Sequence, residues 1–420
     1  MRLGFVIFGG SMKFHILFIL ALTGLAARTE KAWSEELLLK EALETALAKN
    51  PDIEAFHRAH RAAASRVGAE QGYDSTKIFF ESMYSGRERT IGVSQDIPFP
   101  GKLTLRGAVA RREADMAEQA LRSKELDVAA KVRAAYAMLY LARKSIDIYE
   151  ESAGLVRHFA KAAEAKYASG KAGQVDALKA QMELAKIQNA LVALEQEKET
   201  AQAMLNILMN QDPETPLGTL QEPKLMDLKL EYLSLSQAAL ANRPELRESL
   251  HHVHHFKAAL RSARFNYLPD FMVQARRRSA DNPEMDGSSD FMIGATVPLW
   301  VSKPYGNARA AKLEAEKSEA EFQSVKNMTL WTLKDLLAKV QAAKRLVELY
   351  RTSVIPLAEN ALKVTQAAYL SDRSSLLDLI DVQRNYLQFR LEHHQHLAEY
   401  EKSLAELEQI VGIPLSEVKQ

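Results

Sequence analysis

Two stretches of this sequence, residues 166–181 and 368–383, align without a gap at an offset of 202 residues. Four identities fix the alignment: Tyr167 with Tyr369, Ser169 with Ser371, Asp176 with Asp378, and Gln181 with Gln383. Each stretch places small and polar residues between long hydrophobic heptads, which predicts a tight turn at the tip of a helical hairpin. The chain must therefore accommodate two long, similar hairpins.

Hydrophobic residues keep the alternating four- and three-residue spacing of a coiled-coil seam around both turns. Around the first turn they are Val128, Val132, Ala135, Leu139, Ala142, Ile146, Tyr149, Ala153, Val156, Ala160, Ala163, Ala180, Leu184, Ile187, Leu191, Leu194, Ala201, Leu205 and Leu208. Around the second they are Leu336, Val340, Ala343, Val347, Tyr350, Val354, Leu357, Ala361, Val364, Leu379, Val382, Tyr386, Phe389, Tyr400, Leu407 and Ile410. The first helix, about 65 residues from Lys102, would be roughly 95 Å long, too long for a compact globular domain. Pro356 is expected to kink its counterpart.

Other features also occur twice. The helix start at Asn50-Pro51, with Asn50 as cap, returns at Pro244. Aromatic and β-favouring residues replace the heptads at two matched places, which predicts two β-hairpins. The chain is thus a tandem duplication of about 200 residues. The divisions that we expect are a signal peptide (1–27), a first repeat (28–212; β-hairpin about 77–97, helical hairpin about 102–210), a Pro-rich linker (213–236) and a second repeat (237–420; β-hairpin about 268–298, helical hairpin about 306–412).

The first residues predict an export signal. Lys13 precedes an apolar run over residues 14–25, and the small residues Gly24, Ala26 and Ala27 offer a cleavage site. Met12 is an alternative start. At about 12 residues the run is too short to span a bilayer comfortably, and a short membrane anchor is the alternative interpretation. The sequence has no cysteine, so it predicts neither a disulfide nor a lipid-acceptor thiol.

Composition and motifs argue against several classes of protein. The net charge is +1, which argues against a nucleic-acid binder that works by bulk phosphate neutralisation. The sequence contains no Gly-rich phosphate loop, nucleophile elbow or HExxH motif, so we expect neither an enzyme nor a cofactor. No later stretch approaches 18 consecutive apolar residues, and no transmembrane helix is predicted after the leader.

The two β-hairpins constrain how the chain assembles. Four strands cannot close a barrel, and they leave exposed edges. Three copies would supply twelve strands, enough for a closed barrel in a membrane, and the helices would continue the cylinder away from it. The fold class that we expect is mainly α with a small β part: tandem long helical hairpins forming a coiled-coil tunnel, plus two β-hairpins forming a 12-stranded trimeric outer-membrane β-barrel.

The chain resembles the TolC-type outer-membrane efflux proteins over essentially its whole mature length. The matching features are the signal, the two helix starts, the hairpin positions and both tips. Residues 94–102 (SQDIPFPGK) resemble the branch that serves heavy-metal and related cation exporters. Two features depart from the family: the first β-hairpin has strands of about seven or eight residues against the usual 9–11, and the lipidated cysteine of many relatives is missing.

The resemblance implies a homotrimer in the outer membrane of a Gram-negative bacterium, in contact with outer-membrane lipid and with a periplasmic helical tunnel. It also implies docking to a periplasmic adaptor (membrane fusion) protein and to an inner-membrane pump of the resistance-nodulation-division type, which supplies the energy. The expected function is a passive exit duct of a tripartite efflux or secretion system, with heavy-metal cations as candidate cargo. The alternative is an exported coiled-coil scaffold without a pore, which would have no reason to interrupt its heptads with matched β-hairpins.

The resemblance places the constriction that closes the tunnel one turn past the tips. Asp176, Asp378 and Asp381 lie there, and threefold symmetry would gather their like charges into rings. Tyr369 matches a position that helps to hold the closed state, and Arg373 is a candidate partner one residue away from the usual basic position. The alternative is that Asp176 and Asp378 only cap or solubilise the second helix of each hairpin.

The tip loops are the expected contact with the adaptor, in addition to reversing the chain: Ser169, Gly170, Lys171, Gly173, Ser371, Asp372 and Ser374. We expect Gly170 and Gly173 to supply the left-handed or close-approach backbone of the first turn. In the second turn Asp372 and Ser374 take their places.

Histidines form two groups on predicted helices: His251, His252, His254 and His255, then His393, His394 and His396. His251 and His255 have the i,i+4 spacing that can chelate a metal, and His393 and His396 fall on the seam. In a metal exporter these pairs would be weak, transient sites along the duct. We favour the alternative, a surface helix and packed seam residues, because no cysteine or carboxylate completes a site.

Overall fold

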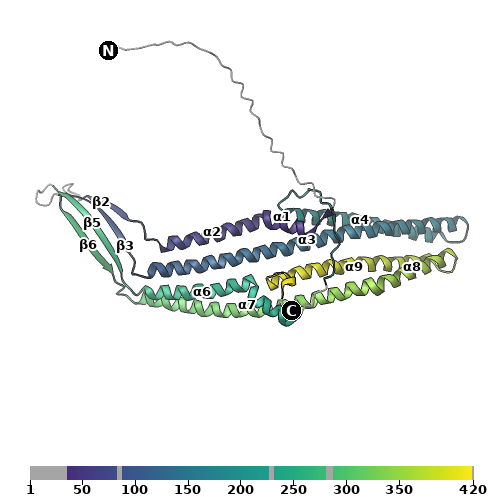
Figure 1. Ribbon diagram of the computed structural model, residues 1–420. Helices are drawn as coiled ribbons and strands as arrows, with labels where there is room; N and C mark the ends of the chain where they lie inside the picture. The colour runs from purple at the N-terminus through teal and green to yellow at the C-terminus, as the bar shows by residue number, and fades with distance from the viewer. Residues whose placement is uncertain (1–35, 83–87, 227–230, 281–286, 419–420) are drawn as a thin grey trace, which may run out of the picture.

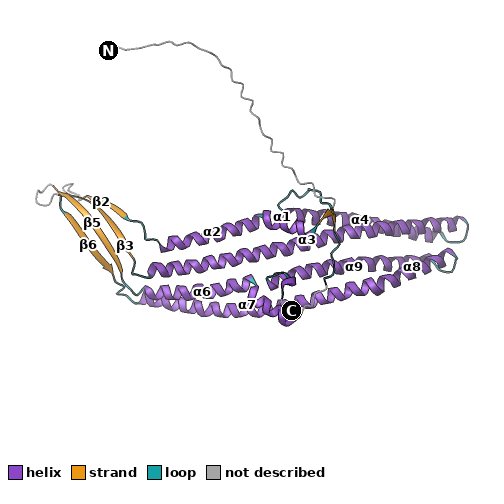
Figure 2. Ribbon diagram, viewed as in Figure 1, coloured by secondary structure: helices purple, strands orange, loops and turns teal. Residues whose placement is uncertain are grey.

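The computed structural model describes residues 36–82, 88–226, 231–280 and 287–418. They form an elongated molecule with a β-sheet at one end and a layer of long helices that runs to the other (Figures 1 and 2). The predicted signal peptide, residues 1–27, and the alternative start Met12 lie outside the described residues. No helix of the described part combines the length and hydropathy that a bilayer crossing requires.

The sheet has the strand order β2-β3-β5-β6 and is antiparallel throughout. Its strands are β2 (Lys77–Ser82), β3 (Glu88–Ile97), β5 (Asp270–Ala280) and β6 (Ser289–Thr296). The sequence-based length of seven or eight residues was wrong for β3, which has ten, because its pairing with β5 continues beyond the end of β2. β5 has eleven residues. The central pair therefore has the length usual for a tilted membrane strand.

The two faces of the sheet differ in polarity. Cross-strand partners put one apolar set on the same face: Ile78, Phe80, Ile91, Val93, Phe271, Val273, Ala275, Phe291, Ile293 and Ala295. The opposite face carries mostly polar side chains, among them Thr90, Ser94, Gln274, Arg276, Arg278 and Asp290. On that polar face the ring of Phe79 covers Gly92, where a Cβ would lie 2.4 Å from a ring carbon. No helix of the described residues covers the apolar face, since Ile78, Phe80, Phe291 and Ile293 are all more than half exposed.

The first half contains α1 (Leu39–Lys49), α2 (Pro51–Gln71), α3 (Lys102–Ala168) and α4 (Gln174–Leu208). Asn50 caps α2 as its sequence position indicates, because its Oδ1 accepts the N–H of Asp52 at 2.9 Å. The same side chain donates from Nδ2 to the carbonyl of Leu208 at 3.0 Å. Asn50 thus ties the start of α2 to the end of α4.

The second half contains α5 (Tyr232–Asn242), α6 (Pro244–Phe265), α7 (Ser302–Leu349), α8 (Ile355–Leu370) and α9 (Leu376–Val411). A π-helical turn, η1 (Tyr350–Val354), joins α7 to α8, and a short 3-10 helix, η2 (Leu415–Glu417), ends the described chain. α7 begins four residues before the expected start at 306, and α5 begins inside the expected linker. Pro356 follows η1 in the first turn of α8, where its missing N–H costs least.

The π-helical turn changes which residues form the seam. Up to Val347 the predicted seam residues are buried, but Leu357 and Val364 are 73% and 69% exposed. Ala358 and Leu362 are buried instead, so the predicted seam was wrong beyond η1. The buried positions of α7 match those of α3 at an offset of 201, and those of α8 match at 202. The five-residue turn therefore absorbs the one residue by which the second repeat exceeds the first.

The helices lie in one layer. Near the sheet their lateral order is α2-α3-α6-α7, and towards the other end it is α4-α3-α9-α8 (Figure 1). α3 is thus central throughout, whereas α2 and α4 form one edge and α7 and α8 the other. The seam residues predicted for α3 are buried, apart from the partly buried Tyr149, and Val132, Leu139 and Val156 have 0% exposure.

Two tyrosines hold the linker at the middle of the layer. Tyr136 of α3 donates its hydroxyl to the carbonyl of Leu37 at 3.0 Å and accepts the N–H of Gln221 at 2.8 Å. Tyr400 of α9 accepts the N–H of Met226 at 3.2 Å. Between them β1 (Glu36–Leu37) and β4 (Thr219–Leu220) form a short parallel pair that the sequence analysis missed.

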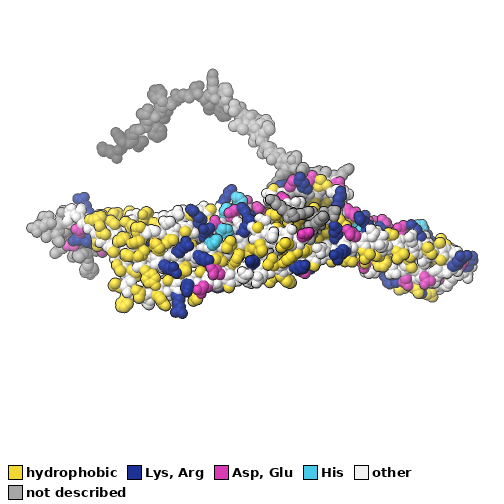
Figure 3. All heavy atoms as spheres, turned by 60° about the horizontal axis from the view of Figure 1, so that its bottom comes forward, with side chains coloured by type: hydrophobic (Ala, Val, Ile, Leu, Met, Phe, Trp, Pro, Cys, Tyr) yellow, Lys and Arg dark blue, Asp and Glu magenta, His cyan; other side chains and the backbone are white. Residues whose placement is uncertain are grey.

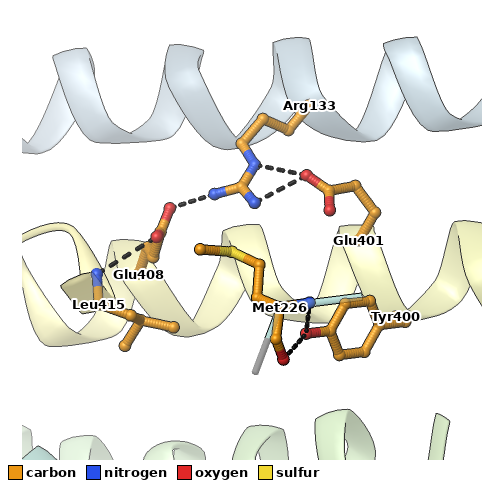
Figure 4. Close-up of polar contacts among 6 residues, drawn as sticks. All are labelled: Arg133, Met226, Tyr400, Glu401, Glu408 and Leu415. Carbon is orange, nitrogen blue, oxygen red and sulfur yellow. Dashed lines mark hydrogen bonds and ion pairs between the residues drawn. The ribbon is translucent and has the colours of Figure 1, made fainter. Parts of the chain in front are cut away.

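An ion-pair network joins the two halves beside Tyr400 (Figure 4). The Arg133 guanidinium of α3 binds Glu401 of α9 through two nitrogens, at 2.9 and 2.7 Å, and also pairs with Glu408. Glu408 accepts the N–H of Leu415 at 3.3 Å with its other oxygen. The side chains of Arg133 and Glu401 are 12% and 7% exposed, so this contact lies in the interior.

The stretch 94–102 builds the joint between sheet and helices. Gly101 has φ +98°, which favours glycine, and the Phe99 ring stacks on Phe271 with centroids 6.4 Å apart. Buried Lys102 donates to Asp270 at 2.8 Å and to the carbonyl of Leu268 at 2.9 Å. This motif therefore fixes the direction in which α3 leaves the sheet.

Candidate functional site

The candidate site is the end of the helical layer farthest from the sheet, where the two hairpin tips lie side by side (Figure 1). α3 and α4 form one tip, and α8 and α9 form the other. A hydrophobic cluster holds the four helices together: Phe159, Ala160, Ala163, Ala180, Leu362, Tyr369, Leu376, Leu379 and Ile380. Its side chains come from both repeats, so the two turns are held against one another within one chain.

The two turns have the same backbone geometry. After α3, the N–H of Gly170 donates to Tyr167 at 2.9 Å and that of Lys171 donates to Lys166 at 2.8 Å, as in a Schellman motif. After α8, the N–H groups of Asp372 and Arg373 make the equivalent bonds. Gly170 and Asp372 are the left-handed residues, with φ +74° and +61°.

The expectation for two other turn residues was wrong. Gly173 has φ −79° and precedes α4 in extended backbone, with open space around its Cβ position. Ser374 is not among the residues with positive φ. One left-handed residue per turn is enough because the next helix starts directly from extended backbone.

Lys166, which the sequence analysis did not single out, connects the two tips. Its Nζ lies 2.5 Å from Oδ1 of Asp372 and 4.1 Å from the centre of the Tyr369 ring, and it donates to the Tyr369 carbonyl. The Lys166 side chain is 16% exposed. Its ammonium lowers the pKa of Asp372. We call these contacts the Lys166 latch.

Tyr369 and Asp176 lie next to this latch. Tyr369 is 4% exposed, and its hydroxyl has no hydrogen-bond partner among the described residues. Burial raises the pKa of Tyr369, and the carboxylates of Asp176 and Asp372 raise it further. Asp176 lies half-buried in the first turn of α4. The structure thus brings Asp372 and Tyr369 together around the Lys166 ammonium, and places Asp176 close enough to Tyr369 to affect its pKa.

Asp378 has a local role at the start of α9. Its Oδ2 accepts the N–H of Ser375 at 3.1 Å and the hydroxyls of Ser375 and Ser374 at 2.7 and 3.2 Å. The Ser375 hydroxyl accepts the N–H of Asp378 in return, which completes a capping box. These hydrogen bonds lower the pKa of Asp378. Within one chain, the contacts of Asp378 are therefore those of a residue that caps α9.

Asp381 and Arg373 are farther from the latch. Asp381 lies 3.6 Å from Arg384, whose Nε donates to Glu183 of α4 at 2.7 Å. Glu183 is 5% exposed, and Arg384 holds its pKa below the usual range. Arg373 is exposed and makes no ion pair with a described residue. The structure therefore gives α4 and α9 a second connection, Glu183–Arg384, and leaves Arg373 pointing to solvent.

The surface of the tips is small, polar and bordered by apolar side chains. Ser169, Lys171, Gly173 and Ser371 are all exposed. Large apolar neighbours are also about half or more exposed: Tyr167, Val175, Leu178, Leu370 and Leu377. One chain thus leaves a mixed apolar and polar surface at its tips uncovered.

The first histidine group faces α3. Nδ1 of His251 lies 3.5 Å from Asp115, and Nδ1 of His255 lies 3.9 Å from Glu113. The two rings thus have different carboxylate neighbours. Among the described residues, no group of three or more His, Asp or Glu side chains is arranged to hold a metal ion.

The second histidine group packs inside the layer. Burial lowers the pKa of His394 to about 3, and its Nδ1 lies 3.0 Å from the Tyr140 hydroxyl. His393 is half-buried, and burial lowers its pKa too. The His396 ring lies 5.3 Å from that of Tyr350. Burial therefore keeps His393 and His394 uncharged at neutral pH, and the His396 ring packs against Tyr350.

Two contacts between the tips, the Lys166 latch and Glu183–Arg384, were not predicted from the sequence. Each joins residues about 200 positions apart, and Lys166 aligns with Ala368 at the repeat offset, so the duplication itself hides it. For Lys166 the available signal was a positive charge in the last turn of α3, which the seam pattern does not require.

A model of the family described as outer membrane efflux protein matches residues 42–211 and 235–413, one segment in each repeat. A curated relative, the cobalt-zinc-cadmium resistance protein CzcC of Cupriavidus metallidurans, is 25% identical over 342 residues, which cover 78% of each chain.

Solved structures share the fold. The chain matches a structure of CusC, described by its transmembrane channel formation, with a TM-score of 0.76 and 17% identity over 89% of this chain and 92% of that one. It matches the CmeC outer membrane channel of Campylobacter jejuni with a TM-score of 0.77 and 16% identity over 90% and 87%. A membrane protein from Pseudomonas aeruginosa gives 0.78 and 17% over 91% and 92%.

Proposed function

The chain belongs to the outer membrane efflux protein family, and from that premise we propose that it is the exit duct of a tripartite system that exports heavy-metal cations. As a member of this family it is an outer-membrane efflux channel, a passive conduit and not an enzyme. Beyond family membership, we propose that the chain forms a trimer with a periplasmic tunnel, that heavy-metal cations are its cargo, and that it has a gate and partner proteins.

The observation that carries the proposal is the open, amphipathic sheet. Its apolar face is uncovered, its opposite face is polar, and its edge strands β2 and β6 each have only one neighbour in the described chain. Four alternating strands let β6 of one copy pair antiparallel with β2 of the next. Three copies would close a twelve-stranded barrel, with the apolar face to lipid and the polar face to a lumen.

The edges of the helical layer support the same closure. α4 presents exposed apolar side chains along one edge: Val175, Leu178, Met182, Val192, Met204 and Ile207. α7 and α8 present another set along the opposite edge: Met328, Trp331, Leu349, Leu357, Val364 and Leu370. Two different edges favour a head-to-tail contact, which closes into a ring. An open cavity of about 740 Å³ beside Met328 and Trp331 offers space for a neighbour's side chains.

The proposed cargo, divalent heavy-metal cations, is supported by the similarity to the cobalt-zinc-cadmium resistance protein. The similarity of residues 94–102 to the heavy-metal and cation branch supports assignment to that branch. It does not identify a site that selects the cargo, because the contacts of these residues build the joint between sheet and helices. We assign the choice of cargo to the inner-membrane pump, proposed to be of the resistance-nodulation-division type, and the coupling to a periplasmic adaptor that would contact the exposed tip surface.

The proposed gate is the ring of tips around the threefold axis. In each chain the Lys166 latch holds the turn after α8 against α3, and Asp176 adds negative charge beside it. Outward movement of α8 and α9 would break the Lys166 latch. The free energy of the latch contacts therefore opposes opening of the tunnel. Asp381, exposed one turn into α9, is the candidate for a ring of like charges.

Conductance tests the channel, and cation sensitivity tests the cargo. The full chain, purified in detergent, should run as an SDS-resistant trimer and form discrete channels in planar bilayers. Cells that lack the chain should become more sensitive to Co²⁺, Zn²⁺ and Cd²⁺, and the wild-type chain should restore resistance. A monomeric preparation without channel activity would contradict the duct, whereas unchanged metal sensitivity would contradict only the cargo.

A further inference from the structure

We propose that a basic groove between α3 and α6, just below the sheet, binds the phosphate of an anionic phospholipid in the periplasmic leaflet of the outer membrane. This inference rests on the proposed function, because it requires the sheet to lie in the membrane. The groove is defined by its lining residues: Gln71, Thr104, Ala108, Arg111, Arg112, His254, Lys257, Ala258 and Arg261.

The charges in the groove are unbalanced. Arg112 pairs with Asp115 at 2.9 Å, and Lys257 pairs with Glu319 at 2.6 Å. Within the described chain, no carboxylate forms an ion pair with Arg111 of α3 or Arg261 of α6, which both line the groove. Two guanidinium groups are therefore free to make paired hydrogen bonds to phosphate oxygens.

The local potential and the space fit an anion. Burial and then the Arg112 guanidinium lower the pKa of His254, as expected where cations outnumber carboxylates. The cavity has a volume of about 370 Å³, enough for a phosphodiester and part of its headgroup. Gly107 lets the side chain of Gln71, which lines the groove, pack directly against α3, because a Cβ at Gly107 would lie 2.3 Å from that side chain.

The groove opens on the lipid side of the layer. Lys102 points to Asp270, which is on the polar face of the sheet together with Met272 and Gln274. Thr104 and Arg111 lie on the opposite side of α3 from Lys102, since the helix turns by about 100° per residue. The groove therefore opens on the side of the apolar face. Figure 3 shows hydrophobic side chains over the sheet end, with Lys, Arg and His side chains beside them on the helices.

The sheet end of the groove lies at the depth of the headgroup layer. Arg261 lies four residues before the end of α6, roughly 6 Å along its axis, whereas Arg111 lies nine residues after the start of α3, roughly 14 Å along its axis. Side chains on a helix lean towards its N-terminus, so the Arg111 side chain leans back towards the sheet. The polar layer of a bilayer extends about 5–8 Å beyond each side of its hydrocarbon core. Leu299 and Trp300, 81% and 86% exposed after β6, are suited to the adjoining interface. Because α3 and α6 are central in the layer, a neighbouring chain in the ring would not cover the groove.

Lipid retention tests the inference. The full-length channel in detergent is titrated with dioleoyl phosphatidylglycerol, dioleoyl phosphatidylcholine or inorganic phosphate, and bound molecules are counted by native mass spectrometry. We expect retention of phosphatidylglycerol by the wild type, roughly thirtyfold weaker retention in Arg111→Gln/Arg261→Gln, and partial recovery in Arg111→Lys/Arg261→Lys. Arg106→Gln/Lys312→Gln, which removes two cations outside the groove, should retain lipid as the wild type does.

Several results would overturn the inference. Equal retention by the groove variant and the wild type, or equal loss in the Arg106/Lys312 control, would contradict a specific groove. Equal binding of both lipids, or competition by millimolar inorganic phosphate, would show that an anionic lipid is not the ligand. If the groove variant does not assemble, the comparison of the two lipids and phosphate on the wild-type channel still decides whether the channel selects an anionic lipid. Planar-bilayer conductance of the same samples separates the two claims, because channels that conduct without selective lipid retention refute only the groove.

Discussion

Arg133 on α3 and Glu401 on α9 form an interior ion pair, with Nη2 2.7 Å from Oε1, between the two repeats of the chain. Neither repeat contains both partners, so the pair forms only when α3 packs beside α9. The duplicated halves are therefore parts of one folding unit, and the position of one helical hairpin fixes that of the other.

Removing Arg133 should destabilise the subunit strongly. Arg133→Ala leaves Glu401 buried without its partner, and breaking a buried pair in this way costs about 3–5 kcal/mol. We expect a clearly lower thermal unfolding midpoint by circular dichroism in detergent. Arg122→Ala, which removes an exposed pair with Glu118 on the same helix, should change stability by less than about 0.5 kcal/mol. Equal midpoints for the two variants would contradict an interior network.

Weakening the Lys166 latch should open the channel. Lys166→Ala removes the contacts to Asp372 and Tyr369, so we expect larger or longer-lived openings in planar bilayers. Asp176→Ala should act in the same direction. Lys171→Ala, in the same turn but without an ion pair among the described residues, is the control. Wild-type conductance in Lys166→Ala would exclude the latch as part of the gate.

The latch should withstand moderate acid. Lys166 lowers the pKa of Asp372 below its ordinary value of 3.8, so this contribution is fully present above that value. It is lost only as the pH falls through the depressed pKa of the folded protein. Conductance should therefore stay constant between about pH 5 and 7 and rise only below about pH 4. An opening transition near pH 6 would indicate that histidines, and not Asp372, control the gate.

The capping box should affect stability and not gating. Ser375→Ala removes the side chain that accepts the N–H of Asp378, at a cost of about 1 kcal/mol. Faster backbone hydrogen exchange in the first turn of α9, with unchanged conductance, is the expected result. A conductance change as large as that of Lys166→Ala would show that the start of α9 belongs to the gate.

The π-helical turn should tolerate a deletion that α8 does not. Removing exposed Thr352 from η1 gives the second repeat the spacing of the first and keeps Ala358 and Leu362 on the seam. Removing Glu359 instead rotates Leu362 away from the seam by about 100°. We expect a near-native melting temperature for the first deletion and a large decrease for the second. The same decrease in both would contradict a one-residue insertion.

Part of this architecture follows from periodicity. The sequence located both helical hairpins, both β-hairpins and the Asn50 cap, because heptads, prolines and turns are local signals. The register beyond Val347 was missed, since either Leu357 or Ala358 satisfies an apolar pattern and only the length of η1 selects between them. The ten-residue β3 was missed because its pairing with β5 depends on a strand 180 positions away in the sequence.

The candidate site was predictable only in outline. The repeat identified Asp176, Asp378 and Tyr369, but equal sequence positions turned out to have different contacts. Asp378 closes a capping box with Ser375, whereas the equivalent Asp176 follows Gly173, which has no side chain to complete one. Lys166 has no counterpart in the second repeat, so no pattern within the sequence could pair it with Asp372.

The lipid-facing side of the sheet should reject charge. Phe291→Arg puts a cation on the uncovered apolar face and should lower insertion into vesicles, by about 2–4 kcal/mol if the position is near the bilayer midplane. Gln274→Arg, on the polar face, should insert as the wild type does. The same loss in both variants would show that the two faces do not have different environments.

Pairing of β6 with β2 of the next chain is the central claim, and because the sequence lacks cysteine, engineered thiols can test it directly. Phe291→Cys is combined in turn with a cysteine at each position of β2, the full chain is oxidised in the membrane, and the products are separated on a denaturing gel. We expect at least one combination to give covalent trimers, and no single-cysteine variant to do so. Monomers in every combination, from protein that is folded and membrane-inserted, would contradict a barrel shared by three chains.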